Sequence, residues 1–490
     1  MRTYSTVLFL FLAMSITKSF CLQEMEVLKM TQKQFSQAMN WVDNSMKLHG
    51  LDSMSILKNQ TISSLALRDC AKLYEESEFR LNQMMFEKSS YSNEDALIWI
   101  SALMTNHRTC LDGLNEKGYF QGDQILGRNL TRLLGQTLAF YSNNKVKGKE
   151  QPQRNTILEE NDGLLESWSL ANNKADLTVA QDGSGTHKTI KEAVDALASM
   201  GHNRPSRAII HVKAGVYHEK VEIGSKLHNV MFVGDGIDKT VVTGNKNVVH
   251  GSTTLDSATF DVSGDGFWAR DMTFENTAGP ENHQAVALKV SSDLSVFYRC
   301  SFKAYQDTLY VHSNRQFYRD CHIYGTIDFI FGDAAVVLQN CDIFIRKPMS
   351  QQSNFITAQG RDDPNKPTGI SIQNCRVRPD SEFSMVKDNF NSFLGRPWKK
   401  YSRTVFIKSD LDELIHPKGW GEWEGNFAVS TLYYGEYMNY GNGASTQNRV
   451  NWPGFHVLNS ANEASQFTVS RFLQGGYWIS GSGVPFWAGI

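Results

Sequence analysis

The chain has 490 residues, of which 41% are hydrophobic and 20% are charged, and its formal net charge is −2. This composition is ordinary for a globular protein and excludes wholesale disorder. A chain of this length is too long for one small core, so we expect two domains. The near-zero net charge gives no overall attraction to nucleic acid or to an anionic membrane, and we expect neither as a partner.

Residues 1–22 have the pattern of a secretory signal peptide. Arg2 supplies the positive start, and the apolar run from Val7 to Ile16 is too short to span a bilayer comfortably. The alternative is a buried helix or a membrane anchor. We expect cleavage of this segment and secretion of the protein to the extracellular space. An oxidising compartment permits disulfides, and the sequons at Asn59 and Asn129 are candidate glycosylation sites.

Residues 23–145 are predicted to be helical. The first 151 residues contain no proline, and only 7 of the 37 glycines precede residue 160. Because proline and glycine are the main helix breakers, this composition favours helices. Apolar residues recur at helical spacing, which indicates core seams and predicts an all-α four-helix bundle. Cys70 and Cys110 fall on two of these helices and are candidates for a disulfide. A polar linker is expected over residues 146–175.

Residues 176–490 are predicted to form an all-β domain. Ten of the 11 prolines lie here, between short runs rich in Val, Ile, Thr, Phe and Tyr. One helical segment stands out, near Ile190 to Met200. Five short segments share one pattern and repeat every 20 to 34 residues: RDMTF (270–274), YRCSF (298–302), YRDCHI (318–323), LQNCDI (338–343) and IQNCRV (372–377). This repeat predicts a parallel β-helix with one coil per repeat, and an antiparallel sandwich is the alternative.

The repeat places cysteines and polar residues at equivalent positions. Cys300, Cys321, Cys341 and Cys375 would stack on neighbouring coils, either as disulfides or as small buried hydrophobes, and the sequence does not assign pairs.

Gln284, Gln306 and Asp328 are separated by steps of 22 residues, with Asp307 beside the middle one. Stacked strands lie about 4.8 Å apart, so these groups would converge on one face. Two neighbouring carboxyls suit either an acid and base pair or a nucleophile and acid pair.

Other catalytic patterns are absent from the sequence. It has no Gly-x-Ser-x-Gly elbow and no HExxH or paired-cysteine zinc spacing. What remains is carboxylate chemistry, with glutamine side chains as oxyanion donors.

Five sequence blocks in the second half resemble the signature blocks of plant pectin methylesterases, in that family's order and spacing. They are Gly215-Val-Tyr-His-Glu219, Gln284-Ala-Val-Ala287, Gln306-Asp-Thr-Leu309, Asp328-Phe-Ile-Phe-Gly332 and Leu394-Gly-Arg-Pro-Trp398. The helical half resembles the inhibitor domain that precedes many of these enzymes as a pro-region. This second resemblance depends on helical character and on Cys70 and Cys110.

The resemblance implies a right-handed parallel β-helix that hydrolyses the methyl esters of homogalacturonan in the cell wall without a metal or cofactor. Asp328 would be the nucleophile, Asp307 the acid and then the base, and Arg396 the partner that keeps Asp328 ionised. Gln284 and Gln306 would stabilise the oxyanion. The implied substrate contacts are Thr254, Gln284, Arg396 and Trp398, with Tyr310 and Phe329 as aromatic walls for a sugar ring. We expect a monomer, with methylated pectin and inhibitor proteins as partners.

The resemblance also implies a disulfide between Cys341 and Cys375 and leaves Cys300 free. Two features depart from the family. An early cysteine pair after the signal segment is reduced to Cys21, and the dibasic processing site between the halves is absent around Leu164-Leu165. These departures leave two points undecided by the sequence: inhibition by the helical half, and proteolytic cleavage between the two halves.

Two other functions compete with this one. The first is a β-helix lyase or polygalacturonase, but lyases of this kind typically use calcium and a basic residue, and no calcium-like carboxylate cluster accompanies the ladder. The second is a non-enzymatic cell-wall protein that binds pectin. The presence of Asp307, Asp328 and Arg396 together argues against it.

Overall fold

The computed structural model describes residues 2–48, 62–87, 91–118, 124–143, 163–169 and 171–490. The chain divides into two compact units, Met1–Pro152 and Gln153–Ile490. Each unit is described by itself below. Asn59, one of the two predicted glycosylation sites, and most of the predicted linker lie outside the described residues.

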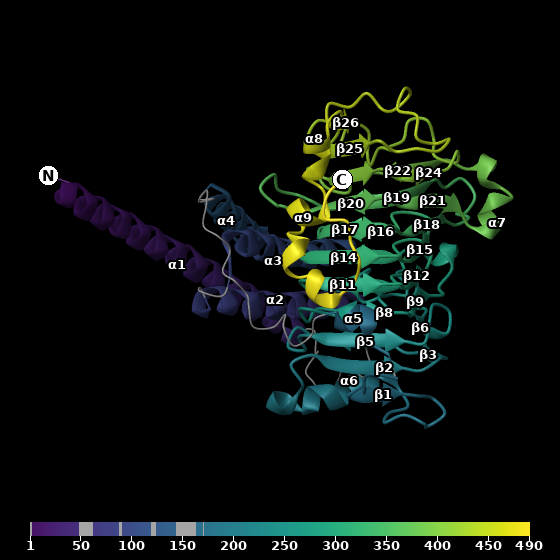
Figure 1. The fold of residues 1–490 in the computed structure, drawn as a ribbon, viewed down its shortest axis with the longest axis horizontal. Coiled ribbons are helices and arrows are strands. Elements are labelled where there is room, and N and C mark those ends of the chain that lie inside the picture. The colour runs from purple at the N-terminus through teal and green to yellow at the C-terminus, as the bar shows by residue number, and fades with distance from the viewer. Residues whose placement is uncertain (1, 49–61, 88–90, 119–123, 144–162, 170) are drawn as a thin grey trace. The chain divides into compact units, whose positions relative to one another are not determined.

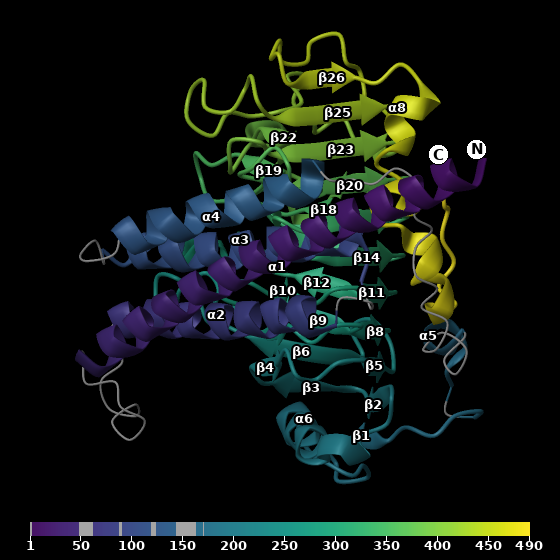
Figure 2. The same ribbon diagram turned by 90° about the vertical axis from the view of Figure 1, so that its left-hand side faces the viewer.

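The N-terminal unit is helical, as predicted (Figure 2). Its helices are α1 (Arg2–Leu48), α2 (Ile62–Phe86), α3 (Asn93–Glu116) and α4 (Gln124–Asn143). Helix α3 begins with a capping box, in which Ser92 and Asp95 each bond to the other's backbone N–H, and such caps satisfy orphan donors at a helix start. Asn129 is exposed on α4. Among the described residues, no helix is both long enough and apolar enough to cross a bilayer.

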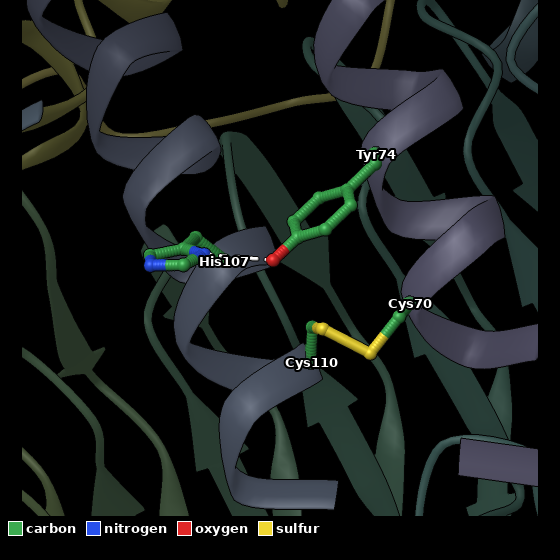
Figure 3. Close-up of a disulfide and its surroundings, with 4 residues drawn as sticks. All are labelled: Cys70, Tyr74, His107 and Cys110. Atoms are coloured by element: carbon green, nitrogen blue, oxygen red, sulfur yellow. Dashed lines mark hydrogen bonds between the residues drawn. A yellow bond between two sulfur atoms is a disulfide. The ribbon is translucent and has the colours of Figure 1, made fainter. Parts of the chain in front are cut away.

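A disulfide joins α2 to α3 through Cys70 and Cys110, which confirms that predicted pair. Their Cα atoms are 4.6 Å apart. Beside it, the Tyr74 hydroxyl and His107 Nδ1 form a buried hydrogen bond of 2.9 Å (Figure 3). His107 Nε2 lies 3.0 Å from the hydroxyl of Thr131 on α4. One covalent bond and one polar chain therefore connect three helices of the bundle.

The C-terminal unit is a parallel β-helix, which confirms the predicted fold (Figure 1). Three parallel sheets of 11, 8 and 7 strands run along it, and each central coil contributes one strand to each sheet. Sheet A contains β1 (Leu177–Val179), β2 (Ala208–Val212), β5 (Val230–Gly234), β8 (Trp268–Arg270), β11 (Ser295–Tyr298), β14 (Arg315–Arg319), β17 (Ala335–Gln339), β20 (Gly369–Gln373), β23 (Arg403–Ile407), β25 (Tyr433–Tyr437) and β26 (Phe455–Val457). Sheet B contains β3 (Gly215–His218), β6 (Thr240–Gly244), β9 (Thr273–Asn276), β12 (Ser301–Lys303), β15 (His322–Gly325), β18 (Asp342–Ile345), β21 (Arg376–Pro379) and β24 (Asp410–Leu411). Sheet C contains β4 (Val221–Ile223), β7 (Phe260–Val262), β10 (Leu288–Val290), β13 (Leu309–Val311), β16 (Ile330–Gly332), β19 (Asn354–Gln359) and β22 (Ser392–Gly395).

Short helices complete this unit: α5 (Leu164–Ser167), α6 (Ile190–Ser199), α7 (Ser381–Ser384), α8 (Ala461–Ser465) and α9 (Val469–Phe472). The predicted helix near Ile190 is α6. Its first turn has a capping box formed by Thr189, the N-cap residue, and Glu192.

The core of the β-helix is filled by residues stacked in register along its axis. Because successive strand residues point to opposite faces, alternate residues of every strand face inward. Phe297 of one coil stacks on Tyr318 of the next, with ring centroids 4.8 Å apart. Leu288, Leu309 and Ile330 form one inward row of sheet C, and all three are fully buried. Regular stacking of this kind leaves the outer face of sheet C to carry polar and aromatic groups.

The corner between sheets A and B turns through a residue with left-handed backbone in successive coils. These residues, which we call the corner ladder, are Asp271, Arg299, Asp320, Asn340, Asn374, Lys408 and Met438. Asn and Asp tolerate this conformation better than other non-glycine residues. The side chains of neighbouring rungs also pair: Arg299 bonds to both oxygens of Asp271, and Asn340 Nδ2 donates to Asp320 at 2.6 Å. The repeated segments found in the sequence contain this corner.

The predicted disulfide between Cys341 and Cys375 is wrong for this structure. Both residues are free and buried, as are Cys300 and Cys321. Cys341 Sγ lies 3.5 Å from the carbonyl oxygen of Gln339, and Cys375 Sγ lies 3.4 Å from that of Leu338. The thiols turn toward main-chain acceptors and fill the core as small hydrophobes, the other arrangement expected for stacked cysteines.

The end of the predicted linker docks on the β-helix. Arg270 Nη1 donates to the carbonyl oxygens of Leu165 and Glu166, at 2.7 and 2.6 Å. Leu165 is fully buried, and the ring of Trp168 lies 5.6 Å from that of His211. We call residues 163–169 the docked segment. This part of the linker therefore belongs to the C-terminal unit.

Candidate active site

The two candidate carboxylates lie at equivalent positions on neighbouring coils. Leu309 pairs with Ile330 in sheet C, and Asp307 and Asp328 each precede their strand by two residues. The Asp307 N–H donates to the carbonyl oxygen of Ile327, which continues the same register toward the corner. Parallel neighbours of this kind have Cα atoms about 4.8 Å apart. The carboxylates are therefore adjacent rungs.

The predicted spacing of 22 residues holds for only part of the ladder. Gln284 and Gln306 do form a parallel bridge. On the neighbouring coil, however, the residue equivalent to Asp328 is Asp307 and not Gln306. Paired residues on neighbouring strands of sheet C are 21 positions apart in the chain. The segment before β10 carries one residue more than the segment before β13, and this extra residue produces the step of 22.

Both carboxylates stand on strained backbone. Asp307 has φ 64° and Asp328 has φ 52°, in the left-handed region. Both side chains are buried, with 7% and 5% of their residue surface exposed. Such conformations cost free energy, and they persist where the surrounding structure fixes them, often at functional sites. Asp307 and Asp328 both lie in the turn between sheet B and sheet C, directly before strands whose residues pack in the core.

Arg396 binds Asp328 through both carboxylate oxygens. Arg396 Nε lies 2.8 Å from Oδ1 and Nη2 lies 2.6 Å from Oδ2. Arg396 comes directly after β22 and its backbone N–H donates to Thr357 on β19. Its guanidinium lies between two rings, 4.4 Å from the centroid of Phe355 and 4.5 Å from that of Trp423. These contacts fix the orientation of the fork, and bidentate charge-assisted bonds are among the strongest in proteins.

The electrostatics of this pair balance burial against charge. Burial raises the pKa of Asp328 above its ordinary value, and the hydrogen bonds and charge of Arg396 oppose that rise. Burial would lower the pKa of Arg396, but the bonds to Asp328 outweigh it and the pKa is raised. The short bidentate contact is that of an ionised pair. Asp328 is thus a buried carboxyl whose ionised form is favoured by Arg396 and disfavoured by burial.

Two glutamines belong to the same part of the β-helix as the carboxylates: Gln306 directly precedes Asp307, and Gln284 pairs with Gln306. Gln284 and Gln306 are half-buried, and neither side chain has a hydrogen-bond partner in the part of the chain that the structure describes. Each amide nitrogen has two donor hydrogens. Donors placed in this way suit the negative oxygen that forms when a nucleophile attacks an ester carbonyl.

Aromatic residues form a cluster on the outer face of sheet C. It comprises Ala258, Val286, Tyr310, Phe331 and Ala358, with Trp398 and Trp423 packed against them. Tyr310 stacks on Phe331 with centroids 4.2 Å apart, and Trp398 meets Phe331 edge-on at 6.0 Å. A Cβ atom on Gly360 would approach within 2.8 Å of the Trp398 ring, so only glycine leaves room for it. The predicted contacts Tyr310 and Trp398 therefore lie together.

The prediction that Phe329 forms an aromatic wall is wrong. Phe329 is fully buried in the main core. The left-handed backbone at Asp328 interrupts the alternation of inward and outward side chains. Phe329 and Ile330 therefore both face inward, and Phe331 faces outward. Sequence reasoning missed Phe331, Phe355 and Trp423. Strand alternation counted from Ile330 would have found Phe331, whereas no sequence signal identifies the other two.

Thr254 lies in a loop that is fastened to the Gln284 segment. Its carbonyl oxygen accepts a hydrogen bond of 2.7 Å from Ser257 Oγ, which in turn accepts one of 3.1 Å from the Val286 N–H. The side chain of Thr254 is half-buried. Its role as a substrate contact remains a prediction.

This arrangement can support carboxylate-based ester hydrolysis. It combines a carboxylate bound to an arginine, a neighbouring carboxyl, two amide side chains and an aromatic face. Among the described residues, no group of three or more His, Cys, Asp or Glu side chains is arranged to hold a metal ion.

Comparison with known protein families agrees with this geometry. The pectinesterase family model matches residues 176–476, and the plant invertase/pectin methylesterase inhibitor model matches residues 18–140. The chain belongs to the pectinesterase family. The resemblance found in the five sequence blocks is thereby confirmed, as is the inhibitor-like character of the helical half.

Individual relatives support the same assignment. A probable pectinesterase/pectinesterase inhibitor from Arabidopsis thaliana is 56% identical over 455 residues, covering 87% of this chain and 87% of the relative. The solved pectin methylesterase from carrot is 53% identical and superposes with a TM-score of 0.64, covering 66% of this chain and all of the carrot chain. A pectin methylesterase solved in complex with a hexasaccharide is 28% identical with a TM-score of 0.51, covering 61% of this chain and 97% of its own.

Proposed function

We propose that this pectinesterase-family enzyme hydrolyses the methyl esters of homogalacturonan to pectate and methanol, with Asp328 as nucleophile and Asp307 as proton donor and acceptor. The observation that carries the proposal is the bidentate bond from Arg396 to Asp328 beside a second carboxyl one rung away. A nucleophile must be ionised and oriented, and Arg396 provides both conditions. A proton shuttle must be close, and Asp307 is the neighbouring rung.

The first half of the reaction forms an acyl-enzyme. The Asp328 carboxylate attacks the ester carbonyl carbon, and Gln284 and Gln306 donate hydrogen bonds to the resulting oxyanion. The intermediate collapses by breaking the bond to the methoxy oxygen, which takes a proton from Asp307 and leaves as methanol. An anhydride between Asp328 and the uronic acid remains, and Asp307 is now ionised.

The second half regenerates the enzyme. Asp307 accepts a proton from an incoming water as the water oxygen attacks the uronate carbonyl of the anhydride. The bond to the Asp328 oxygen breaks, and Asp328 returns to Arg396 as a carboxylate. The product is an uronic acid group, which ionises in water. One ester and one water thus give one acid and one methanol.

Methanol release from highly methylated pectin tests the assignment. We expect Asp328→Asn and Asp307→Asn to lose nearly all activity while keeping the fold, since both changes preserve side-chain size. Unsaturated or shortened oligogalacturonides without methanol would favour a lyase or polygalacturonase instead. Wild-type methanol release by Asp328→Asn would contradict the proposed nucleophile.

We further propose that the protein is secreted to the cell wall as a monomer and that its inhibitor-like helical unit restrains the enzyme. The inhibitor family match supports this role. The test compares the full chain with a fragment of residues 163–490, which keeps the docked segment. A more active fragment supports autoinhibition. Equal activity contradicts it.

A further inference from the structure

A groove lies on the β-helix at the corner between sheets A and B. The candidate active site is elsewhere, on the outer face of sheet C. Its volume is about 860 Å³, within the range of roughly 300–1,000 Å³ common for ligand sites. One wall is the corner ladder and the adjoining start of sheet B: Asn340, Asn374, Arg376, Lys408 and Tyr440. The other wall is the C-terminal segment Phe486–Ile490, at the yellow end of the chain in Figure 1. None of these residues takes part in the candidate active site.

The C-terminal wall is held rigidly against two successive coils. Gln339 and Trp487 exchange two hydrogen bonds, from the Trp487 N–H to Oε1 at 2.9 Å and from Nε2 to the Trp487 carbonyl at 3.0 Å. Gln373 Nε2 donates to the carbonyl oxygen of Gly489 at 2.7 Å. The Arg319 guanidinium lies 4.2 Å from the centroid of the Trp487 ring. Trp487 is therefore a fixed platform, although 45% of it is exposed.

The wall formed by the corner ladder contains polar groups that make no hydrogen bond or ion pair with the described part of the chain. Within the described part of the chain, neither the Lys408 ammonium nor the Asn374 side-chain amide has a hydrogen-bond or ion-pair partner. Arg376 uses Nε and Nη2 to bind Asp342, at 2.6 and 2.7 Å. Its Nη1 remains available, and its side chain is 62% exposed. The nearby Asp342 is neutralised by that pair, so the wall presents cations and amides.

An exposed ring also lies at the ladder end of the groove. Tyr440 is 58% exposed and Trp487 is 45% exposed, so both rings present surface to the solvent in the groove. Aromatic rings present an apolar face with a polar edge, suited to a ligand that is apolar on one face and wet elsewhere. A sugar ring has such a face. A uronate also has a carboxylate, which a lysine or arginine recognises by charge-assisted hydrogen bonds.

We propose that this groove is a second polysaccharide site, which binds a de-esterified, anionic stretch of the uronate polymer. The choice of polymer rests on the proposed function, whereas the preference for an anionic sugar rests on Lys408, Arg376 and the two exposed rings. De-esterified stretches are the product of the reaction. An enzyme that holds product in the groove keeps the same polymer molecule near Asp328, because tethering replaces free diffusion with a high effective concentration.

Binding of de-esterified oligogalacturonate to the full-length protein tests the proposal by calorimetry. We expect Lys408→Glu to weaken binding about ten- to a hundredfold, because it replaces a charged hydrogen bond with repulsion. Trp487→Ala should weaken it in the same direction. Lys188→Glu, which reverses the charge of an exposed lysine at the other end of the β-helix, is the matched control. Equal affinity of Lys408→Glu and wild type would overturn the proposal.

A second measurement separates the groove from the active site. Methanol release from a short methyl-esterified oligomer should be unchanged in Lys408→Glu, whereas release from long, partly de-esterified pectin should show a raised KM. Equal KM values on the long polymer overturn the proposal. Because the binding assay contains no ester, a protein that binds oligogalacturonate through Lys408 but releases no methanol would contradict the proposed function and leave the groove intact. Equal binding of fully methylated polymer would contradict the anionic ligand.

Discussion

Arg396 holds both oxygens of Asp328, at 2.8 and 2.6 Å, although the two residues are 68 positions apart in the chain. The contact with Arg396 favours the charged carboxylate in a site where burial favours its neutral form. The rate of an Asp328 nucleophile should therefore depend on pH through this pair.

Replacing Arg396 should move the acid limb of the pH profile. In the wild type, burial raises the pKa of Asp328 and Arg396 opposes the rise. Arg396→Gln removes the opposing charge, so the pKa rises further and activity is lost at a higher pH as pH falls. The measurement is kcat/KM for methanol release against pH. Arg396→Lys, which keeps the charge but not the fork, should give an intermediate shift. An acid limb that does not move in Arg396→Gln would contradict the role of the pair.

Asp307→Asn should separate the two halves of the reaction. Loss of a positioned acid and base lowers rates by about 10²–10⁴-fold. An activated ester, whose alcohol leaves without a proton, should restore acylation but not the attack of water. We expect a burst of one alcohol per chain followed by slow turnover, measured by rapid quench. Steady release without a burst would indicate that another group activates the water.

Most of the fold could be predicted from the sequence because each repeated segment contains the turn between sheet A and sheet B. The corner ladder recurs in segments such as YRDCHI and LQNCDI, where an Asp or Asn precedes a buried cysteine at the left-handed turn. The carboxylates were also found, but not their register. One extra residue before β10 gives Gln284 and Gln306 a spacing of 22, and extending that spacing paired Gln306 with Asp328 incorrectly.

Periodicity could not supply contacts between distant coils. Arg396 came only from family resemblance, and Trp423 came from neither source, because both reach the site from loops beyond the repeats. Phe329 was misplaced because the left-handed backbone at Asp328 interrupts the alternation that normally separates inward from outward residues. The cysteines were correctly stacked, but a spacing rule cannot decide whether a thiol turns toward its neighbour or toward a carbonyl.

The disulfide should dominate the stability of the helical unit. Cys70 and Cys110 are separated by 40 residues, and closing a loop of that length stabilises the folded state by about 4 kcal/mol in the chain-entropy estimate. The double variant Cys70→Ala and Cys110→Ala should unfold at lower temperature, followed by helical circular dichroism. Reductant should lower the wild-type transition in the same way and leave the variant unchanged. A reductant effect on the variant would point to the buried cysteines of the β-helix instead.

The docked segment should resist proteolysis as long as Arg270 holds it. Arg270 binds the carbonyl oxygens of Leu165 and Glu166, and Trp168 is 4% exposed. We expect limited proteolysis of the full chain to cut before residue 163 and to leave the docked segment on the enzyme unit. Arg270→Ala should add cleavage sites within residues 163–169, read by mass spectrometry, whereas Arg299→Ala on the neighbouring rung should not. Identical cleavage patterns for all three proteins would contradict a role for Arg270.

The buried pair of Glu436 and Arg449 should be costly to break. Each side chain is 2% exposed, and Arg449 binds Glu436 through Nε at 2.8 Å and Nη2 at 3.1 Å. Trp420 Nε1 donates to the same carboxylate at 3.2 Å, and its ring stacks on Tyr434 with centroids 4.1 Å apart. The pair is therefore part of the packing of β25 as well as an electrostatic contact.

Removing one partner leaves a buried charge without compensation, which costs about 3–5 kcal/mol. Arg449→Met should lower the free energy of unfolding of the β-helix unit by that amount in urea titrations. The double variant Arg449→Met with Glu436→Leu should recover much of the loss, since replacing both charges with apolar groups removes their desolvation penalty. A double variant no more stable than Arg449→Met would show that the hydrogen bond to Trp420, rather than the ion pair, is what stabilises this end of the helix.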